Sequence, residues 1–170
     1  MHATGTSHSP YAGPSPAAVG MLRRTVLWGG LALLAGCAGD KPPVVTQLTL
    51  DVAAAADLNP DARGRASPLT VRVYALKTPG PFQTADFFSL YDKDTATLGA
   101  ELVKREEFQL APGQKKSLQF TLPPEAKSVA VMAAYRDLER ARWRDLKPLD
   151  VGKPNTFKLE LGARQVSLNP

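Results

Sequence analysis

Residues 128–135 read SVAVMAAY, and this stretch decides the fold. It is apolar after its first residue and carries no charge, so both alternating sets of positions are suited to burial. A strand with one solvated face alternates apolar and polar residues, whereas a strand covered on both faces is apolar throughout. We therefore predict a central strand at residues 128–135 that is buried on both faces.

The segments around this strand show the period-two alternation of half-buried strands. They are residues 44–52, 69–77, 116–122 and 155–161, with a weaker strand at residues 102–110, and turn signals such as Pro112-Gly113 and Pro123-Pro124 separate them. Residues 137–149 fit either a turn of helix or a strand, with Trp143 buried in both cases. About seven strands of this kind predict an all-β, two-sheet β-sandwich.

One helix is predicted within the sandwich, at residues 82–91 (FQTADFFSLY). Thr84 is a candidate N-cap, and Phe87, Leu90 and Tyr91 fall on one side of the helix. Because four aromatic residues occur in so short a segment, we expect the helix to dock on the sheets as a short helical insertion.

The N-terminal segment contains an export signal. Arg23 and Arg24 precede an uncharged run at residues 25–36 (TVLWGGLALLAG), which is too short for a membrane span of roughly 20 residues. Residues 34–37 (LAGC) resemble the lipobox of bacterial lipoproteins, in which the cysteine is lipidated and the chain is cut just before it. Cys37 is thus predicted to carry a covalent lipid anchor.

Three regions follow from this signal. Residues 1–36 form an N-terminal extension and signal peptide that is removed, residues 37–43 form the lipidated cysteine and a spacer, and residues 44–170 form the β-sandwich domain. Since residues 1–20 carry no charge, translation is expected to start at Met21. Ala38 follows the cysteine where many lipoproteins kept in the inner membrane have Asp, which favours the outer membrane.

The residue inventory excludes several chemistries. His2, His8 and Cys37 are the only histidines and the only cysteine, so the predicted domain has no imidazole and no thiol. Cysteine or serine–histidine hydrolysis, zinc ligation by nitrogen or sulfur, and a disulfide scaffold all lack their residues. Loss of Arg23 and Arg24 lowers the net charge from +5 to +3, which gives little support to nucleic-acid binding.

The carboxylates do not form a catalytic or metal-binding motif either. Glu106 and Glu107 are neighbours on a strand and point to opposite faces, so they cannot flank one glycosidic bond. Residues 92–95 (DKDT) begin like a calcium loop but lack its third ligand and its glycine, which favours a polar turn. We therefore predict no catalytic site, no metal site and no cofactor other than the lipid on Cys37.

Two segments remain as candidate binding surfaces. Residues 53–68 join two predicted strands and are too long for a hairpin turn, and long loops are often functional. Basic residues cluster between residues 136 and 147 and alternate with acidic ones. This alternation favours a surface salt-bridge network, with contact to an acidic protein partner as the alternative. The basic residues are Arg136, Arg140, Arg142, Arg144 and Lys147, and the acidic ones are Asp137, Glu139 and Asp145.

An ordered set of motifs resembles the outer-membrane lipoprotein family of the type VI secretion system, known as TssJ, VasD or Lip. The motifs are the lipobox, Leu58-Asn59-Pro60-Asp61 with Gly64-Arg65 and Ser67-Pro68, the strand at residues 71–77, Phe82 with Ala85-Asp86-Phe87, Leu98-Gly99, and residues 134–138 (AYRDL) with Trp143-Arg144. The likeness runs from residue 37 to about 165.

This resemblance implies a transthyretin-like β-sandwich anchored in the outer membrane and facing the periplasm. It also implies a partner, the periplasmic C-terminal domain of TssM, and through it the inner-membrane TssL–TssM complex. The family binds TssM through the loop between its first two strands, here residues 53–68. By position in the motif, the contact residues would be Asn59, Pro60, Asp61, Arg63, Gly64 and Arg65.

Two other functions stay open at this point. A lipoprotein could carry or chaperone a small ligand or lipid between its sheets, which would require an apolar cavity. An enzyme built on carboxylates alone ranks last, because no pair of carboxylates is suitably spaced.

Overall fold

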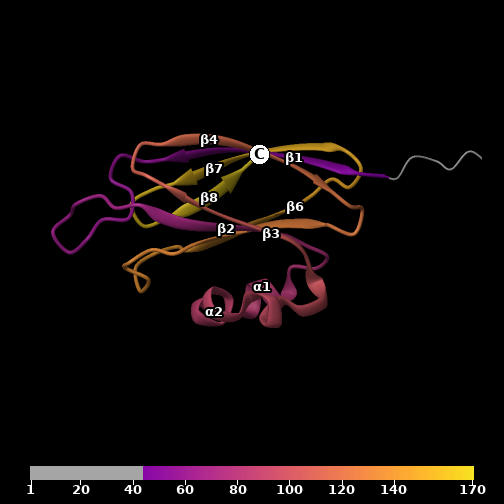
Figure 1. Ribbon diagram of the computed structural model, residues 1–170, viewed down its shortest axis with the longest axis horizontal. Coiled ribbons are helices and arrows are strands. Elements are labelled where there is room, and N and C mark those ends of the chain that lie inside the picture. Colours follow the sequence, from indigo (N-terminus) through magenta and orange to yellow (C-terminus); the bar gives the residue numbers. More distant parts are fainter. Residues whose placement is uncertain (1–43) are drawn as a thin grey trace, which may run out of the picture. The chain divides into compact units, whose positions relative to one another are not determined.

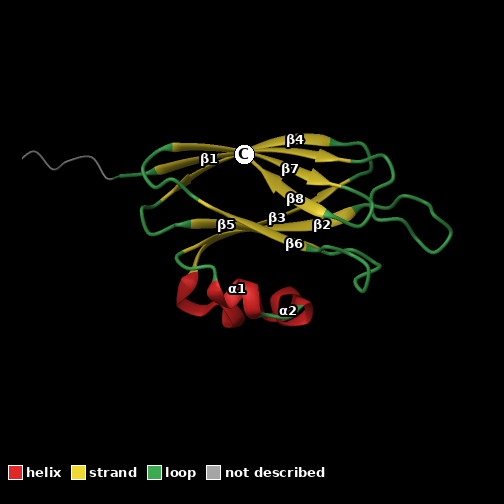
Figure 2. Ribbon diagram, turned by 180° about the vertical axis from the view of Figure 1, so that it is seen from behind, coloured by secondary structure: helices red, strands yellow, loops and turns green. Residues whose placement is uncertain are grey.

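The computed structural model describes residues 44–170, which form two four-stranded sheets packed face to face (Figures 1 and 2). The predicted two-sheet sandwich with a helical insertion is therefore confirmed. Residues 1–36, residues 37–43 and the lipidation site Cys37 lie outside the described residues. Neither helix among residues 44–170 is long and apolar enough to cross a membrane.

The first sheet has the strand order β4-β1-β7-β8. Its strands are β1 (Thr46–Ala54), β4 (Lys115–Leu122), β7 (Pro154–Leu161) and β8 (Val166–Asn169). β1 runs antiparallel to β4 and parallel to β7, so the first strand lies inside its sheet with hydrogen-bonded neighbours on both sides.

The second sheet has the strand order β3-β2-β5-β6, with every neighbouring pair antiparallel. Its strands are β2 (Leu69–Leu76), β3 (Leu102–Leu110), β5 (Ser128–Ala133) and β6 (Arg144–Pro148). β2 and β5 occupy the centre of this sheet. All six residues of β5 are buried, as its apolar sequence predicts.

The helical insertion between β2 and β3 covers the outer face of the second sheet (Figures 1 and 2). It consists of α1 (Gly80–Thr84), α2 (Phe87–Leu98) and the 3-10 turn η1 (Gly99–Glu101). Side chains on β2 and β5 therefore alternate between two hydrophobic cores. On β5, Val129 and Val131 face the first sheet, whereas Ala130 and Met132 face the helices.

Local structure in the insertion differs from the prediction at two points. The helix predicted at residues 82–91 is divided at Asp86, whose carboxylate accepts a 2.9 Å hydrogen bond from the Ser89 N–H. Asp86 rather than Thr84 is thus the N-cap of α2. Residues 92–95 are not a polar turn but part of α2, which is interrupted where Lys93 leaves helical geometry (φ −140°, ψ 37°).

In the C-terminal third of the chain, the structure decides between helix and strand for residues 137–149 and contains one strand that was not predicted. Within residues 137–149, the structure has an irregular connection followed by β6, with Trp143 partly buried against both cores. The strand β8 was not predicted, because its four residues are too few to show a clear alternation.

A pair of substitutions in α2 tests the second core. Leu90 is fully buried between α2 and the sheet, and Phe88 on the same helix is 64% exposed. Leu90→Ala should lower the free energy of unfolding by about 2–5 kcal/mol, because it leaves a cavity. Phe88→Ala should lower it by less than about 1 kcal/mol. Urea unfolding of both variants measures the difference, and equal midpoints would mean that the helices add nothing to the core.

Candidate functional site

The β1–β2 loop (residues 55–68) lies at the end of the sandwich opposite Val44, where the described chain begins (Figure 1). β1 spans this distance, because its nine residues extend about 3.3 Å each. The loop contains all six residues predicted to contact a partner, and the structure divides them into a buried anchor and an exposed tip.

Asn59 is the anchor of the loop. It is 4% exposed and has the left-handed backbone conformation (φ 48°) that Asn tolerates better than most residues. Its Nδ2 donates a 2.9 Å hydrogen bond to the Pro68 carbonyl, and its Oδ1 accepts one of 2.9 Å from the Arg136 N–H. Its own N–H donates to the Ala163 carbonyl at 3.2 Å. Asn59 thus joins three separate segments of the chain.

Asp61 organises the tip of the loop, residues 62–65. Its Oδ1 accepts hydrogen bonds from the N–H groups of Arg63 (2.9 Å) and Arg65 (3.0 Å), and its Oδ2 pairs with the Arg65 guanidinium at 2.8 Å. These hydrogen bonds, led by those from Arg65, hold the pKa of Asp61 below its usual value. The carboxylate is therefore ionised and already occupied, which fixes the tip in one conformation.

The exposed positions of the loop are at the tip. Arg63, Gly64 and Arg65 are exposed, with 73% of the Arg65 side chain accessible, and Gly64 has a φ of 79° that favours glycine. Pro60 and Asp61 are partly buried between the tip and Asn59. Of the six predicted contact residues, Arg63 and Arg65 therefore offer the most side-chain surface to a partner.

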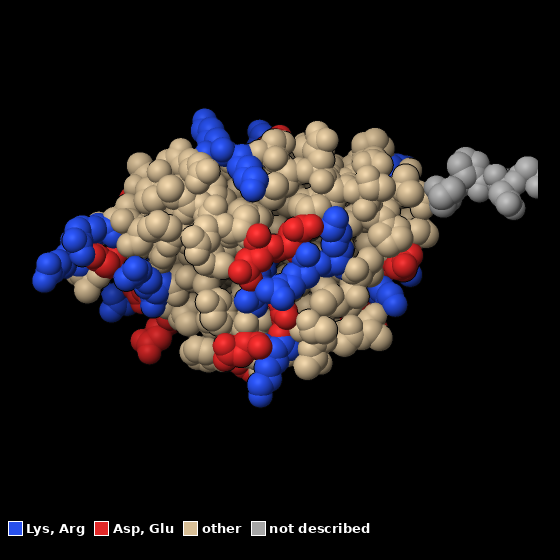
Figure 3. Space-filling model, in the orientation of Figure 1, with Lys and Arg blue, Asp and Glu red and all other residues tan. Residues whose placement is uncertain are grey.

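Beside the loop, the structure forms an open groove of about 720 Å³. We call it the arginine groove. Its lining comes from the β1–β2 loop, the β5–β6 connection and the β7–β8 turn, and consists of Pro60, Asp61, Ala62, Gly64, Arg136, Asp137, Arg140 and Arg164. Charged atoms of both signs gather at this end of the molecule in Figure 3. The two surfaces that the sequence suggested separately are thus adjacent.

The basic cluster is partly the salt-bridge network that its alternating charges predict. Asp137 pairs with Arg140 (3.8 Å) and with Arg164 (2.8 Å). Arg142 pairs with Asp145 at 3.3 Å. The contribution of Arg164 was not predicted, because it comes from a turn far along the sequence.

Arg144 does not belong to this surface network. It lies on β6 and points to the helical insertion, where its Nη1 donates to the carbonyls of Phe82 (2.9 Å) and Ala85 (2.7 Å) at the end of α1. Its guanidinium also lies 4.7 Å from the centre of the Trp143 ring. This side chain therefore attaches α1 to the sheet.

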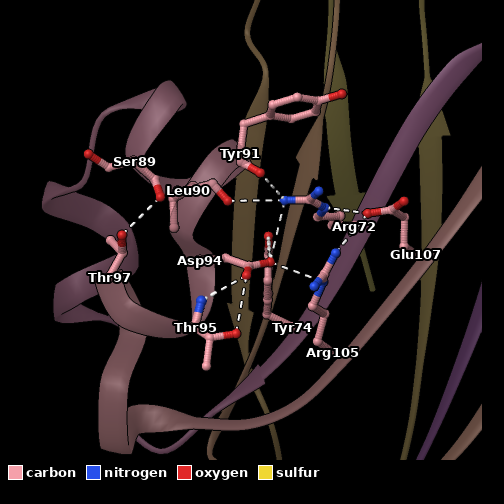
Figure 4. A network of polar contacts seen from close by, with 10 residues as sticks. All are labelled: Arg72, Tyr74, Ser89, Leu90, Tyr91, Asp94, Thr95, Thr97, Arg105 and Glu107. Atoms are coloured by element: carbon pink, nitrogen blue, oxygen red, sulfur yellow. Dashed lines mark hydrogen bonds and ion pairs between the residues drawn. The ribbon is translucent and has the colours of Figure 1, made fainter.

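A second polar cluster joins α2 to β2 and β3 (Figure 4). Asp94 is 6% exposed, and its Oδ2 receives the Arg105 guanidinium at 3.0 Å, the Tyr74 hydroxyl at 3.2 Å and Arg72 at 3.4 Å. Glu107 bridges Arg72 and Arg105 from the strand next to β2. The Arg72 guanidinium holds the pKa of Glu107 below its usual value.

Arg72 also explains why the kink in α2 is tolerated. Its Nη1 donates to the carbonyls of Leu90 (3.1 Å) and Tyr91 (2.7 Å), in the turn before the non-helical Lys93. Carbonyls at a helix break need such partners when they are partly buried. Because each carboxylate in this cluster is paired with arginine, the cluster fixes the helix on the sheet.

Among residues 44–170, no group of three or more His, Cys, Asp or Glu residues is arranged to hold a metal ion. The space between the sheets is occupied by large buried side chains from both sheets, among them Leu48, Leu50, Leu69, Leu110 and Leu159.

Residues 46–164 match the family model described as "Type VI secretion lipoprotein, VasD, EvfM, TssJ, VC_A0113". The chain belongs to the type VI secretion lipoprotein family. The match covers the whole sandwich up to the β7–β8 turn, including the β1–β2 loop. A search of curated proteins found no significant match.

Solved structures support the family and the fold. The T6SS lipoprotein TssJ1 from Pseudomonas aeruginosa is 38% identical, with a TM-score of 0.71, over 75% of this chain and 95% of that chain. Lip from Serratia marcescens, described as a membrane-bound component of the type VI secretion system, is 25% identical, with a TM-score of 0.68, over 73% and 97%.

A third match is to a chain in the structure described as the T6SS protein TssM C-terminal domain from EAEC. That chain is 24% identical, with a TM-score of 0.63, and the match covers 73% of this chain and 98% of that chain. At this identity the match shows a shared fold.

Substitutions of Asn59 test its role as the anchor. Asn59→Ala should lower the free energy of unfolding by about 2–4 kcal/mol, because it removes two hydrogen bonds at a buried site and retains a strained φ. Asn59→Gly should be about 1 kcal/mol less harmful, because glycine adopts this φ freely. The exposed Asp57→Ala is the control and should change stability by less than about 0.5 kcal/mol. Equal urea midpoints for Asn59→Ala and Asp57→Ala would contradict the role of Asn59 in holding the β1–β2 loop.

Proposed function

We propose that this protein is an outer-membrane lipoprotein that docks the trans-envelope complex of a type VI secretion system. In this proposal the lipid on Cys37 holds the sandwich to the outer membrane, facing the periplasm. The β1–β2 loop binds the periplasmic C-terminal domain of TssM, which connects it to the inner-membrane TssL–TssM complex. The action is mechanical and requires no catalytic residue.

The observation that carries the proposal is the geometry of the β1–β2 loop. Its tip is exposed at the end of the domain opposite Val44, and the hydrogen bonds that Asn59 makes and that the Asp61 carboxylate accepts hold it in place. A loop that is already ordered loses little conformational entropy on binding. The tip arginines can also form charge-assisted hydrogen bonds with a partner.

The lipid anchor rests on sequence. Residues 34–37 resemble a lipobox, and the family is one of lipoproteins. Two or more acyl chains provide enough buried methylene groups for stable attachment to a bilayer. Val44 follows Cys37 by seven residues, so the sandwich would be tethered close to the membrane, and the β1–β2 loop lies at the end of the domain opposite Val44.

TssM as the partner rests on the resemblance to the type VI secretion lipoprotein family, whose model matches residues 46–164. The alternative, a carrier of a small ligand or lipid, gains no support from the space between the sheets, because buried side chains occupy it.

Replacement of the loop tip tests the docking site. Changing residues 61–65 (DARGR) to GSGSG should lower the affinity for the periplasmic domain of TssM from the same genome by more than about 100-fold, because it removes both the ordered tip and its charges. The variant retains Asn59 and should stay folded. The control carries Glu125→Ser and Lys127→Ser, two exposed positions at the opposite end. Calorimetry measures the affinity of both variants for the TssM domain. If the tip variant bound with wild-type affinity, the docking site would lie elsewhere on the protein.

Removal of the predicted acylation site tests whether a lipid attaches the protein to the membrane. Cys37→Ser should convert the protein from a membrane-bound to a soluble periplasmic form and abolish secretion, because serine cannot carry the thioether-linked lipid. Membrane fractionation and labelling with radioactive palmitate measure this, with Gly39→Ser as the control that keeps the cysteine. If the Cys37→Ser variant still fractionated with the membrane, the lipid attachment at Cys37 would be refuted.

A further inference from the structure

The arginine groove has three walls that are far apart in sequence. Residues 60–62 and Gly64 of the β1–β2 loop form one wall, the β5–β6 connection with Arg136 and Arg140 forms the second, and the β7–β8 turn with Arg164 forms the third. A surface composed of three segments loses less conformational entropy on binding a partner if the segments already keep fixed relative positions.

Asn59 fixes all three walls. Its side chain bonds to Pro68 at the end of its own loop and to the Arg136 N–H of the second wall. Its backbone N–H bonds to Ala163 in the third wall. The second and third walls are also joined directly, since the Arg142 N–H donates to the Arg164 carbonyl at 2.9 Å and the Tyr135 hydroxyl donates to the Gly162 carbonyl at 3.2 Å. The groove is therefore preorganised without a partner.

The charge in the groove is only partly neutralised within the chain. Arg140 and Arg164 share the single carboxylate of Asp137, whereas the carboxylate of Asp61 is already bonded to Arg65. Within residues 44–170, neither Arg136 nor Arg63 forms an ion pair. The Arg140 side chain is 77% exposed, and that of Arg164 is 43% exposed. Several guanidinium groups are thus available around one concave surface.

We propose that the arginine groove, together with the loop tip, binds an acidic segment of the partner. This inference rests on the proposed docking function and adds the chemistry of the contact. Guanidinium groups bind carboxylates through paired hydrogen bonds, which match a peptide with Asp or Glu side chains. The groove extends the docking surface from the loop to the β5–β6 connection and the β7–β8 turn.

Charge reversal in the groove tests the inference in the intact lipoprotein, purified in detergent. The groove variant carries Arg136→Glu and Arg140→Glu, two exposed positions outside the tip. The matched control carries Lys127→Glu and Lys153→Glu, which make the same change in net charge at the opposite end. A third variant, with both arginines changed to Gln, removes the charges without reversing them. Each is titrated with the periplasmic domain of TssM by calorimetry.

The groove variant should bind roughly 10- to 100-fold more weakly than the wild type, the Gln variant should be intermediate, and the control should bind like the wild type. Raising the salt from about 50 mM to about 300 mM should weaken wild-type binding more than binding of the Gln variant. Equal losses in the groove and control variants would reveal an effect of net charge alone and overturn the inference.

Other outcomes separate this inference from the proposed function. If the wild type binds and the tip replacement does not, but the groove variant retains full affinity, the docking function stands and the groove has no part in it. If the wild type itself fails to bind the TssM domain at micromolar concentration, the docking proposal fails, and the groove inference fails with it.

Discussion

The burial of both faces of β2 and β5 is the constraint on which the rest of this structure depends. A sheet with an apolar outer face cannot be left in water, so the chain inserts two helices between β2 and β3 to cover it. The polar network around Arg72 and Asp94 then fixes α2 on the sheet. With one face against the first sheet and the other against the helices, the second sheet becomes a rigid base for the loops at its ends.

The candidate site depends on one buried amide as much as on its exposed charges. Asn59 lies in the motif that resembles the family, and that resemblance implies that it belongs to the contact surface. The structure shows it turned inward, with hydrogen bonds to the loop end, to Arg136 and to Ala163. Its position in this motif is thus compatible with a supporting role, in which it holds the loop that carries Arg63 and Arg65 at the surface.

Sequence patterns predicted those parts of the fold that local alternation or uniform apolarity determines. They predicted β5 and the two-sheet sandwich, and they located the long loop after the first strand. They failed where distant residues decide the local structure. The DKDT segment at residues 92–95 resembles a turn but is helical, because Arg72 bonds to carbonyls near its kink. Likewise, Arg164 reaches the arginine groove only through the packing of the β7–β8 turn, which no local pattern reveals.

The central position of β1 has a consequence for mechanical force. A pull between Val44 and the β1–β2 loop runs along the axis of β1, which is hydrogen-bonded to β4 on one side and to β7 on the other. The inter-strand hydrogen bonds lie across this axis, so the pull loads them in shear, and many must break together before the strand slides. A strand peeled from a sheet edge would instead lose them one after another. The sandwich is thus suited to transmit tension from one end to the other without unfolding.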